Sequence, residues 1–145
     1  MRAVLQRVVN SKVTVDSIEI ASIGKGILLL LGIGGEDTEE KCEKLVEKII
    51  KMRIFADEEG KTNLSIRDIK GQILIVSQFT LYAETKKGNR PSFSETADPI
   101  KAEKLYNYFI KYCQGKFEKV SQGSFGSNMQ VSLTNNGPFT IILDV

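Results

Sequence analysis

The sequence contains no histidine, and this absence excludes more chemistry than any other feature of its composition. It rules out enzymes that activate a serine or cysteine nucleophile with a neighbouring imidazole, and it rules out zinc sites with a histidine ligand. Because there are only two cysteines, a four-cysteine zinc site is excluded as well. Catalysis by this chain must use carboxylates, lysines, hydroxyls, backbone amides or groups carried by the substrate. We expect no metal and no cofactor.

Long apolar runs and a strong charge bias are also missing. No run approaches the roughly 18 residues of a membrane helix, and charges interrupt the first seven residues, which argues against a signal peptide. We therefore expect a cytoplasmic protein with no membrane partner. Cys42 and Cys113 lie far apart in helical patterns, so we expect two small buried apolar residues rather than a disulfide. The net charge is only +2, which argues against strong nonspecific binding of nucleic acid by a basic tail. Binding by a local basic patch stays an open alternative.

Repeats, low-complexity tracts and proline- or glycine-rich linkers are missing too. A chain of 145 residues, of which 41% are hydrophobic, has the size of one domain. A domain of this length buries roughly two thirds of its unfolded surface, so it folds without disulfides or a structural metal. We therefore expect residues 1–145 to form a single domain.

Alternating and continuous apolar patterns predict several strands. Residues 27–31 form an unbroken apolar run between glycines, which indicates a central strand covered on both faces. Residues 12–15 and 18–20 predict a hairpin around Asp16 and Ser17. The other expected strands are residues 2–9, 73–76, 117–120, 128–134 and 139–144.

Two segments change to the helical period. Apolar side chains within residues 42–50 share one helical face, and Asp37 with Glu40 three residues later fits a capping box at its start. A second helix begins where Asp98 caps and a proline occupies the first turn, and Gly115 is its expected end. The order of the elements predicts an α+β fold with a mostly antiparallel, bent or barrel-like sheet and two covering helices.

Several segments place polar or glycine-rich residues where a site often forms. Residues 77–81 put two hydroxyls and an amide at a strand end, where pockets often open, although for this segment taken alone a strand passing through a Ser/Thr-containing bend is the favoured explanation. Residues 135–140 have the composition of a hairpin turn, and their Gly-Pro bond can be cis at a cost of about 0.5–1 kcal/mol. Residues 86–93 gather three cations that either grip phosphates or form a solvated loop. Residues 123–129 indicate a bend or bulge, and residues 57–63 a turn that lacks the ligand spacing of a calcium loop.

Together these segments resemble the D-aminoacyl-tRNA deacylase family. Each motif is weak alone, but their joint order and spacing are specific and extend over essentially the whole chain. The residues that carry the resemblance are Gln6-Arg7-Val8, Ser77-Gln78-Phe79-Thr80-Leu81, Lys87-Gly88-Asn89-Arg90-Pro91-Ser92-Phe93, Phe125 through Met129, and Asn135-x-Gly137-Pro138-x-Thr140.

The resemblance implies a homodimer in which a cis Gly137–Pro138 unit of one subunit enters the active site of the other and selects chirality. It implies that the pocket meeting the aminoacyl ester and the terminal adenosine is formed by Ser77, Gln78, Phe79 and Thr80. The other residues it assigns to the substrate are Arg7, Phe125, Met129, Asn135 and Thr140. We expect the tRNA backbone to be bound by Lys86, Lys87 and Arg90.

The implied reaction is hydrolysis of the ester bond of D-aminoacyl-tRNA. A rigid carbonyl at the position of an L side chain excludes anything larger than hydrogen, so glycine, for example glycine mischarged on tRNA-Ala, is poorly excluded. The 2′-hydroxyl of the terminal adenosine would supply the missing base, and N–H groups near Phe79 and Thr80 would stabilise the oxyanion. Thr80 as a covalent nucleophile is less favoured, because no activating base is identifiable.

Two departures from the family pattern flank these motifs. Phe139 stands where the family usually has valine, and Ser127 stands where it usually has alanine; the first affects loop packing or the dimer contact.

Two other functions stay open. One is editing of L-alanyl-tRNA by a related branch, against which Ser77-Gln78-Phe79 argues. The other is a noncatalytic dimeric RNA-binding module whose cations hold phosphates.

Overall fold

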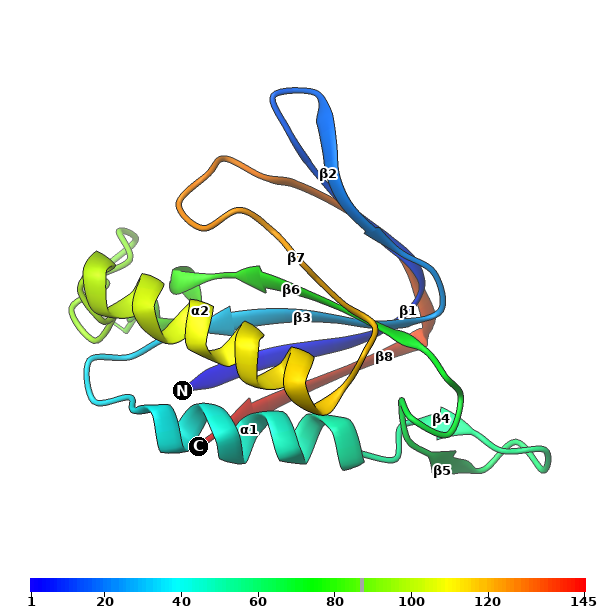
Figure 1. Ribbon diagram of the computed structural model, residues 1–145. Coiled ribbons are helices and arrows are strands. Elements are labelled where there is room, and N and C mark those ends of the chain that lie inside the picture. Colours follow the sequence, from blue (N-terminus) through cyan, green and yellow to red (C-terminus); the bar gives the residue numbers. More distant parts are fainter. Residues whose placement is uncertain (87) are drawn as a thin grey trace.

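The computed structural model describes residues 1–86 and 88–145, which form a mixed sheet with two helices packed on one face (Figure 1). The strands of the sheet are β1 (Arg2–Val15), β2 (Ile18–Ile23), β3 (Gly26–Gly32), β6 (Gln72–Ser77), β7 (Val120–Gln122) and β8 (Gln130–Asp144). The helices are α1 (Glu39–Lys51), α2 (Pro99–Lys116) and the short 3₁₀ helix η1 (Phe79–Tyr82). The expected α+β class with a bent sheet under two helices is confirmed.

The sheet has the order β2-β1-β3-β6-β7, and β8 pairs with the other edge of β1. All pairs that involve β1 are antiparallel, whereas β3–β6 and β6–β7 are parallel. The parallel pairs follow from their connections, because α1 lies between β3 and β6 in the chain and α2 lies between β6 and β7. The sheet is therefore mixed, which refines the expectation of a mostly antiparallel one.

β1 bends strongly because it serves two neighbours on one edge. Its first half pairs with β3 and its second half pairs with β2, with an irregularity between Val13 and Thr14. The expected hairpin is confirmed: Asp16 and Ser17 have φ values of 48° and 66°, as a tight turn that matches strand twist requires.

The prediction of two separate C-terminal strands with a turn at residues 135–140 is wrong. β8 runs without interruption from Gln130 to Asp144 along β1. The extra residues of β8 are absorbed by a register shift opposite Gln6 and Val8, and a second shift places an extra residue on β1 between Val8 and Asn10; neither reverses the chain. Pairing of β8 with the long strand β1 thus outweighs the turn preference of residues 135–140.

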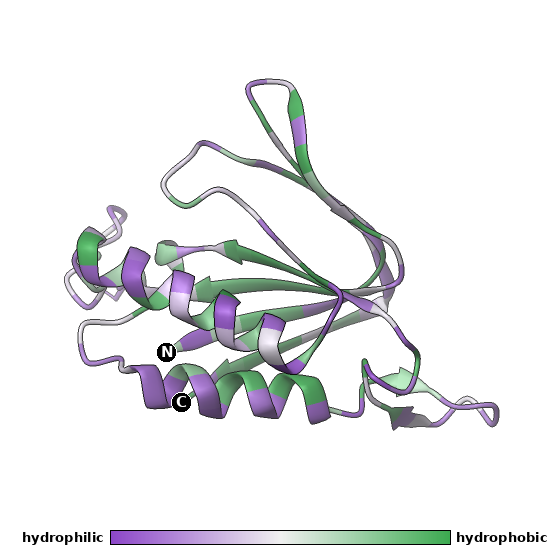
Figure 2. Cartoon of the chain, in the orientation of Figure 1, coloured by the Kyte–Doolittle hydropathy of each residue, from purple (hydrophilic) through white to green (hydrophobic). Residues whose placement is uncertain are grey.

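The core lies on both faces of β3 and β6. In β3, Ile27, Leu29 and Leu31 pack under the helices, whereas Leu28 packs in a smaller cluster on the concave face. β6 alternates in the same way. Figure 2 shows both strands as almost continuously hydrophobic, which confirms the expectation of a central strand covered on both sides.

The helix boundaries differ slightly from expectation. The N-cap of α1 is Thr38, whose hydroxyl accepts from the Lys41 N–H, and not Asp37, which is buried and makes other contacts. α2 begins as predicted, with Asp98 capping Lys101 N–H, and extends one residue past Gly115. Because several neighbouring polar residues can each act as the N-cap, a helix boundary predicted from the sequence alone can differ from the observed one by a residue.

The two cysteines are buried free thiols, as expected. Burial raises the pKa of both Cys42 and Cys113 to about 12, so neither is an activated nucleophile. Within the described part of the chain, no helix is both long and apolar enough to cross a membrane.

The small hairpin of β4 (Phe55–Ala56) and β5 (Thr62–Leu64) was not predicted from the sequence. It extends beyond the C-terminal end of α1 (Figure 1). Its turn is the one expected at residues 57–63: the Asp57 carboxylate accepts from the N–H groups of Glu59 and Lys61. Two strands of two and three residues are too short to leave a periodic signal. The strand expected at residues 117–120 is observed instead as β7 at residues 120–122, because three residues are likewise too few for a clear periodic pattern.

Gly26 provides a test of how closely β3 approaches β6. A Cβ at this position would overlap the backbone carbonyl of Gln72, whereas a Cβ at Gly35 would meet open space. We expect Gly26→Ala to lower the free energy of unfolding by about 3 kcal/mol, because neither backbone can yield. Gly35→Ala is the matched control and should change it by less than about 0.5 kcal/mol in urea unfolding. Equal stabilities of the two variants would contradict the packing described here.

Candidate active site

A cavity of about 550 Å³ opens where β3 and β6 end. Leu31 and Val76 form its floor, and η1, the start of α2 and the segment before β8 form its walls. Of the residues named from the sequence, Ser77, Gln78, Phe79, Phe125 and Met129 line it. Segments far apart in the chain thus meet at one site, mostly apolar with a few polar groups, which is the usual composition of a small-molecule pocket.

Buried contacts position the apolar wall. Tyr106 of α2 donates from its hydroxyl to the Ile75 carbonyl at 3.0 Å and packs against the Phe125 ring with a centroid distance of 5.5 Å. Burial raises the pKa of Tyr106, so its hydroxyl stays a neutral donor. A Cβ on Gly123 would lie 2.7 Å from the Met129 sulfur, so glycine lets Met129 reach the cavity. These residues shape the site.

The polar edge of the cavity is η1 and the residues before it. Gln78 N–H donates to Leu31 O at 2.8 Å, and the Gln78 side-chain amide donates to the Thr80 hydroxyl. Thr80 itself lies outside the cavity lining. The Phe79 side chain is 59% exposed and packs edge-on against Phe93 with ring centroids 5.0 Å apart. An exposed aromatic pair at the mouth of a cavity is a platform on which a base can stack.

η1 also presents backbone donors. Its internal bonds begin with Leu81 N–H to Gln78 O. The N–H groups of Phe79 and Thr80 have no acceptor among residues 1–86 and 88–145, as expected at the start of a helix. Two such amides beside a pocket can stabilise negative charge on a carbonyl oxygen.

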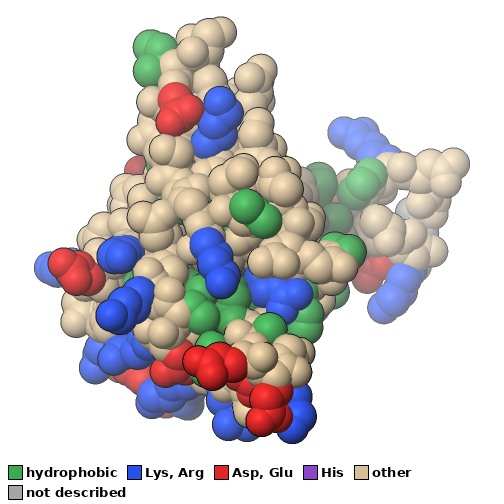
Figure 3. Space-filling model, turned by 90° about the vertical axis from the view of Figure 1, so that its right-hand side faces the viewer, with side chains coloured by type: hydrophobic (Ala, Val, Ile, Leu, Met, Phe, Trp, Pro, Cys, Tyr) green, Lys and Arg blue, Asp and Glu red, His purple; other side chains and the backbone are tan. Residues whose placement is uncertain are grey.

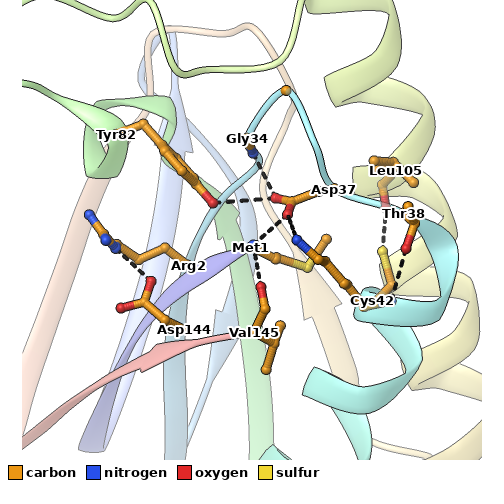
Figure 4. A network of polar contacts seen from close by, with 12 residues as sticks. Met1, Arg2, Gly34, Asp37, Thr38, Cys42, Tyr82, Leu105, Asp144 and Val145 are labelled. Atoms are coloured by element: carbon orange, nitrogen blue, oxygen red, sulfur yellow. Dashed lines mark hydrogen bonds and ion pairs between the residues drawn. The ribbon is translucent and has the colours of Figure 1, made fainter.

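Tertiary contacts hold η1, because a single 3₁₀ turn with every residue at least partly exposed has little stability of its own. Arg2 Nη1 donates to the Leu81 carbonyl at 3.0 Å, and its guanidinium carbon lies 5.4 Å from the Tyr82 ring centre. The Tyr82 hydroxyl makes a long hydrogen bond of 3.4 Å to Asp37, and a Cβ on Gly34 would lie 2.9 Å from the ring. Figure 4 shows these groups converging.

Asp37 is the centre of this network. Its carboxylate accepts from the Met1 ammonium at 2.5 Å, the Gly34 N–H at 2.7 Å and the Lys41 ammonium at 3.1 Å. Burial alone raises the pKa of this carboxyl, but these donors outweigh it and hold the pKa below its ordinary value. Burial and the nearby Asp37 charge raise the pKa of Tyr82 to about 12. The sequence did not indicate this role, because Asp37 fits a capping-box pattern at the start of α1.

The remaining residues implied to bind substrate lie elsewhere on the chain. Arg7 Nε donates to Asn136 O at 2.8 Å, Arg7 Nη1 donates to Ile54 O at 2.7 Å, and the guanidinium lies 4.6 Å from the Phe139 ring centre. Asn135 pairs with Val8, and Thr140 pairs with Gln6. Arg7 therefore contacts the segment that carries Gly137 and Pro138.

This segment lies at the opposite end of the sheet from the cavity. Arg7 pairs with Ile27 of β3, whereas the cavity begins at Leu31, four residues further along. Four strand residues span about 13 Å, and the three strand spacings from β6 to β8 add about 14 Å across the sheet. Gly137–Pro138 is therefore not part of the cavity of its own chain.

The implied cis Gly137–Pro138 bond is corrected by the structure. No cis peptide bond occurs among the described residues, so this bond is trans. In the single chain the segment lies within β8 at the register shift opposite Gln6 and Val8 of β1, and the trans form is the ordinary one for X-Pro bonds by about 0.5–1 kcal/mol. Gly137 has a φ of +123°, which side chains rarely adopt, and a Cβ there would lie 2.6 Å from Arg7 Nη2.

The expected phosphate-binding loop leaves the site between Glu84 and Ser92. Glu84 and Ser92 pair at its base through backbone bonds of 2.8 and 3.0 Å. Lys86 forms an exposed ion pair of 3.7 Å with Glu84, Arg90 is exposed, and Lys87 lies outside the described residues. The loop joins the end of η1 to Phe93, which lines the cavity.

Several lining residues were not singled out from the sequence. They include Ile33, Thr96, Ala97, Pro99 and Ala102. Pro99 and Ala102 were assigned only to a helix start and its apolar face. Small residues there leave room for the cavity, but nothing in a helical pattern distinguishes a pocket wall from a core face. Phe93 and Ser127 were noted within motifs, without a place in the pocket.

Comparison with known proteins assigns this chain to a family. The family model for D-Tyr-tRNA(Tyr) deacylase matches residues 4–144. The D-aminoacyl-tRNA deacylase of Thermosipho africanus is 54% identical over 144 residues, which are 99% of this chain and 97% of the relative. That of Haemophilus influenzae is 54% identical over 145 residues, the full length of both. A solved structure of the c-Myc DNA unwinding element binding protein superposes with a TM-score of 0.95 at 43% identity, covering 100% of this chain and 99% of that chain.

Similarity at this level over the whole length defines the class of the protein, a hydrolase that acts on ester bonds. The chain belongs to the D-Tyr-tRNA(Tyr) deacylase family. The family and the enzyme class predicted from the sequence are confirmed.

The buried carboxylate of Asp37 predicts a pH-dependent stability. Because its pKa is lowered in the folded state, its contribution is present above about pH 4, the unfolded value, and is lost as the pH falls further. We expect Asp37→Asn to lower the free energy of unfolding by about 3 kcal/mol at pH 7, since the Met1 ammonium stays buried without its partner. The deficit should shrink as the pH falls below 4 in urea unfolding series.

Glu40→Gln is the control for this prediction. It removes an exposed ion pair with Lys44 on the same helix and should change stability little at any pH. A deficit of Asp37→Asn that stays constant down to pH 2 would show that the carboxylate charge is not responsible.

Proposed function

We propose that this chain hydrolyses the ester bond of D-aminoacyl-tRNA and releases the free amino acid and tRNA. One observation carries the proposal: Ser77, Gln78, Phe79, Phe125 and Met129, which carry the family motifs, converge on one cavity of about 550 Å³. Relatives at 54% identity that span the chain are D-aminoacyl-tRNA deacylases. A role of this kind in translation belongs to the cytoplasm.

The terminal adenosine stacks on Phe79, and the aminoacyl group enters the apolar cavity. The exposure of Phe79 and its support by Phe93 fit a stacking platform. The ester carbonyl then lies beside the N–H groups of Phe79 and Thr80, which hold the oxyanion. Lys86, Lys87 and Arg90 contact the tRNA backbone near its end.

The substrate supplies the proton transfer that the chain cannot. The adenosine 2′-hydroxyl assists a water molecule that attacks the carbonyl carbon; the bond to the 3′-oxygen breaks, and that oxygen takes a proton. This assignment fits a sequence without histidine, in which Thr80 has only the Gln78 amide as a side-chain partner among the described residues. The protein contributes position and oxyanion stabilisation.

Chirality is selected by rejection, with Gly137–Pro138 supplied by a second copy of the chain. The segment is exposed and lies at the far end of the sheet from its own cavity, so it serves a cavity only across a dimer interface. Held by Arg7 and pointing carbonyls into the neighbouring site, it leaves no space for an L side chain. Glycyl-tRNA, including glycine mischarged on tRNA-Ala, is accepted because glycine has only hydrogen there.

Hydrolysis of D- and L-tyrosyl esters on the same tRNA tests the proposal. We expect the D-ester to be cleaved faster by about 100-fold or more. Gly137→Ala should erode this ratio, because alanine is strained at the observed φ and meets Arg7. Preferential release of L-alanine would instead assign the chain to the L-alanyl editing branch. Tight, salt-dependent RNA binding without hydrolysis would indicate a noncatalytic binding module.

A tRNA ending in 2′-deoxyadenosine tests the source of the proton transfer. We expect this substrate to be cleaved at least about 100-fold more slowly, whereas Thr80→Ala retains much of the activity on the ordinary substrate. Single-turnover rates with D-tyrosyl-tRNA measure both. Normal cleavage of the deoxy substrate together with an inactive Thr80→Ala would show that the Thr80 hydroxyl, and not the 2′-hydroxyl of the RNA, takes part in the proton transfer.

A further inference from the structure

A second cavity, of about 400 Å³, opens at the C-terminal end of α2, far from the candidate active site. It is lined by Arg67 and Lys70 before β6, by Lys116 at the end of α2, and by Glu118 and Lys119 after it. We call these four cations the basic cluster. α2 separates the two cavities: Pro99 and Ala102 line the first, and Lys116 lines the second. Eighteen helical residues span about 27 Å.

The basic cluster concentrates positive charge in a nearly neutral chain. Four cations and the carboxylate of Glu118 line this cavity, and Lys116 also forms an ion pair of 3.5 Å with Glu47 of α1, which leaves a surplus of two positive charges, as many as the +2 of the entire sequence. Figure 3 views the molecule from the side on which β4 and β5 project and shows Lys and Arg side chains over this end of the molecule. A local surplus of this kind attracts a polyanion that the chain as a whole would not.

The cluster is also held in place. Arg67 Nη2 donates to the Lys116 carbonyl at 2.6 Å, and Lys119 Nζ donates to the Lys70 carbonyl at 3.3 Å, so each cation-bearing segment binds the other. Arg67 has five N–H donors and a lysine ammonium has three, which leaves donors on both for a ligand. Cations fixed in this way lose less freedom on binding phosphate oxygens.

The cluster lies at the same end of the sheet as Gly137–Pro138. Val8 pairs with both Asn135 and Gly26. Gly26 in turn pairs with Gln72, which lies two residues after Lys70 of the cluster. Three strand spacings separate β8 from β6, about 14 Å. In the proposed dimer, the subunit whose Gly137–Pro138 enters a cavity thus carries its basic cluster at the same end of its sheet as that segment.

We propose that the basic cluster binds backbone phosphates of the RNA whose aminoacyl end occupies the active site of the other subunit. This inference rests on the proposed function and extends it: one subunit holds the ester, and its partner supplies both the chirality-selecting segment and a phosphate contact. The RNA strand leaves the cavity across the dimer interface and meets the cluster about one to two nucleotide lengths beyond Gly137–Pro138.

The double variant Lys70→Gln, Lys119→Gln tests the contact. With D-tyrosyl-tRNA we expect kcat/KM to fall about tenfold at low salt, and the slope of log kcat/KM against log salt to fall by about 2. With the D-tyrosyl ester of adenosine, which has no backbone to reach the cluster, kcat/KM should stay unchanged. Lys44→Gln, Lys48→Gln on α1 removes the same charge and should have little effect on either substrate. An unchanged salt slope in the first variant would overturn the proposal.

Mixed dimers test which subunit the cluster serves. One chain carries Lys70→Gln and Lys119→Gln with an intact cavity; the other carries Phe79→Ala with an intact cluster. We expect mixing to restore full kcat/KM per intact cavity on D-tyrosyl-tRNA. If the cluster served its own cavity, the mixed dimer would be as weak as the double variant, and the proposed arrangement would be wrong.

Binding of uncharged tRNA separates this inference from the proposed function. Fluorescence anisotropy with the wild type and the double variant reports the phosphate contact without any hydrolysis. A wild type that binds tRNA but fails to cleave D-tyrosyl-tRNA contradicts the proposed function alone. Equal, equally salt-dependent tRNA affinities of wild type and double variant contradict the basic cluster alone.

Discussion

The pairing of β1 on both of its edges is the constraint on which the rest of this structure depends. β8 follows one edge for almost its full length, while β3 and β2 share the other. This ladder fixes which residues lie at each end of the sheet. It places the cavity at the Leu31 end and the Gly137–Pro138 segment at the Ile27 end. A strand held by two neighbours cannot slide without moving its core side chains to the wrong face, so the separation is rigid.

That separation is what the proposed function uses to obtain selective ester hydrolysis from a small chain without histidine. The cavity provides an apolar space, an exposed aromatic pair and two backbone amides, while the segment proposed to reject one stereoisomer belongs to another copy in the proposed dimer. Rejection by a rigid backbone needs no reactive side chain. The proton transfer, in turn, is assigned to the RNA. The protein is then mainly a positioning device, in which backbone geometry matters more than titratable groups.

Positioning requires that η1 be held firmly, and a buried charge network does this. Asp37 joins the Met1 ammonium, the loop after β3 and Tyr82, and Arg2 holds the Leu81 carbonyl beside it. Burying such a carboxylate is costly unless donors surround it, and here they outweigh burial enough to lower its pKa. The network therefore couples the first residues of the chain to the turn that carries the site.

The sequence by itself determined the α+β class, the two helices, the central apolar strand and the family, because these depend on periodicity and on the order of motifs. It also identified part of the cavity: residues 77–79, Phe125 and Met129 belong to motifs that lie far apart in the sequence and line one cavity in the structure. Tertiary structure alone decided that residues 130–144 form one strand, that Asp37 is a hub rather than a cap, and that Gly137–Pro138 is trans and remote from its own cavity. These features depend on partners distant in sequence: a long neighbouring strand, a chain terminus and a tyrosine ring. Local composition records none of them, since the free energy that selects each one comes from contacts that exist only after folding.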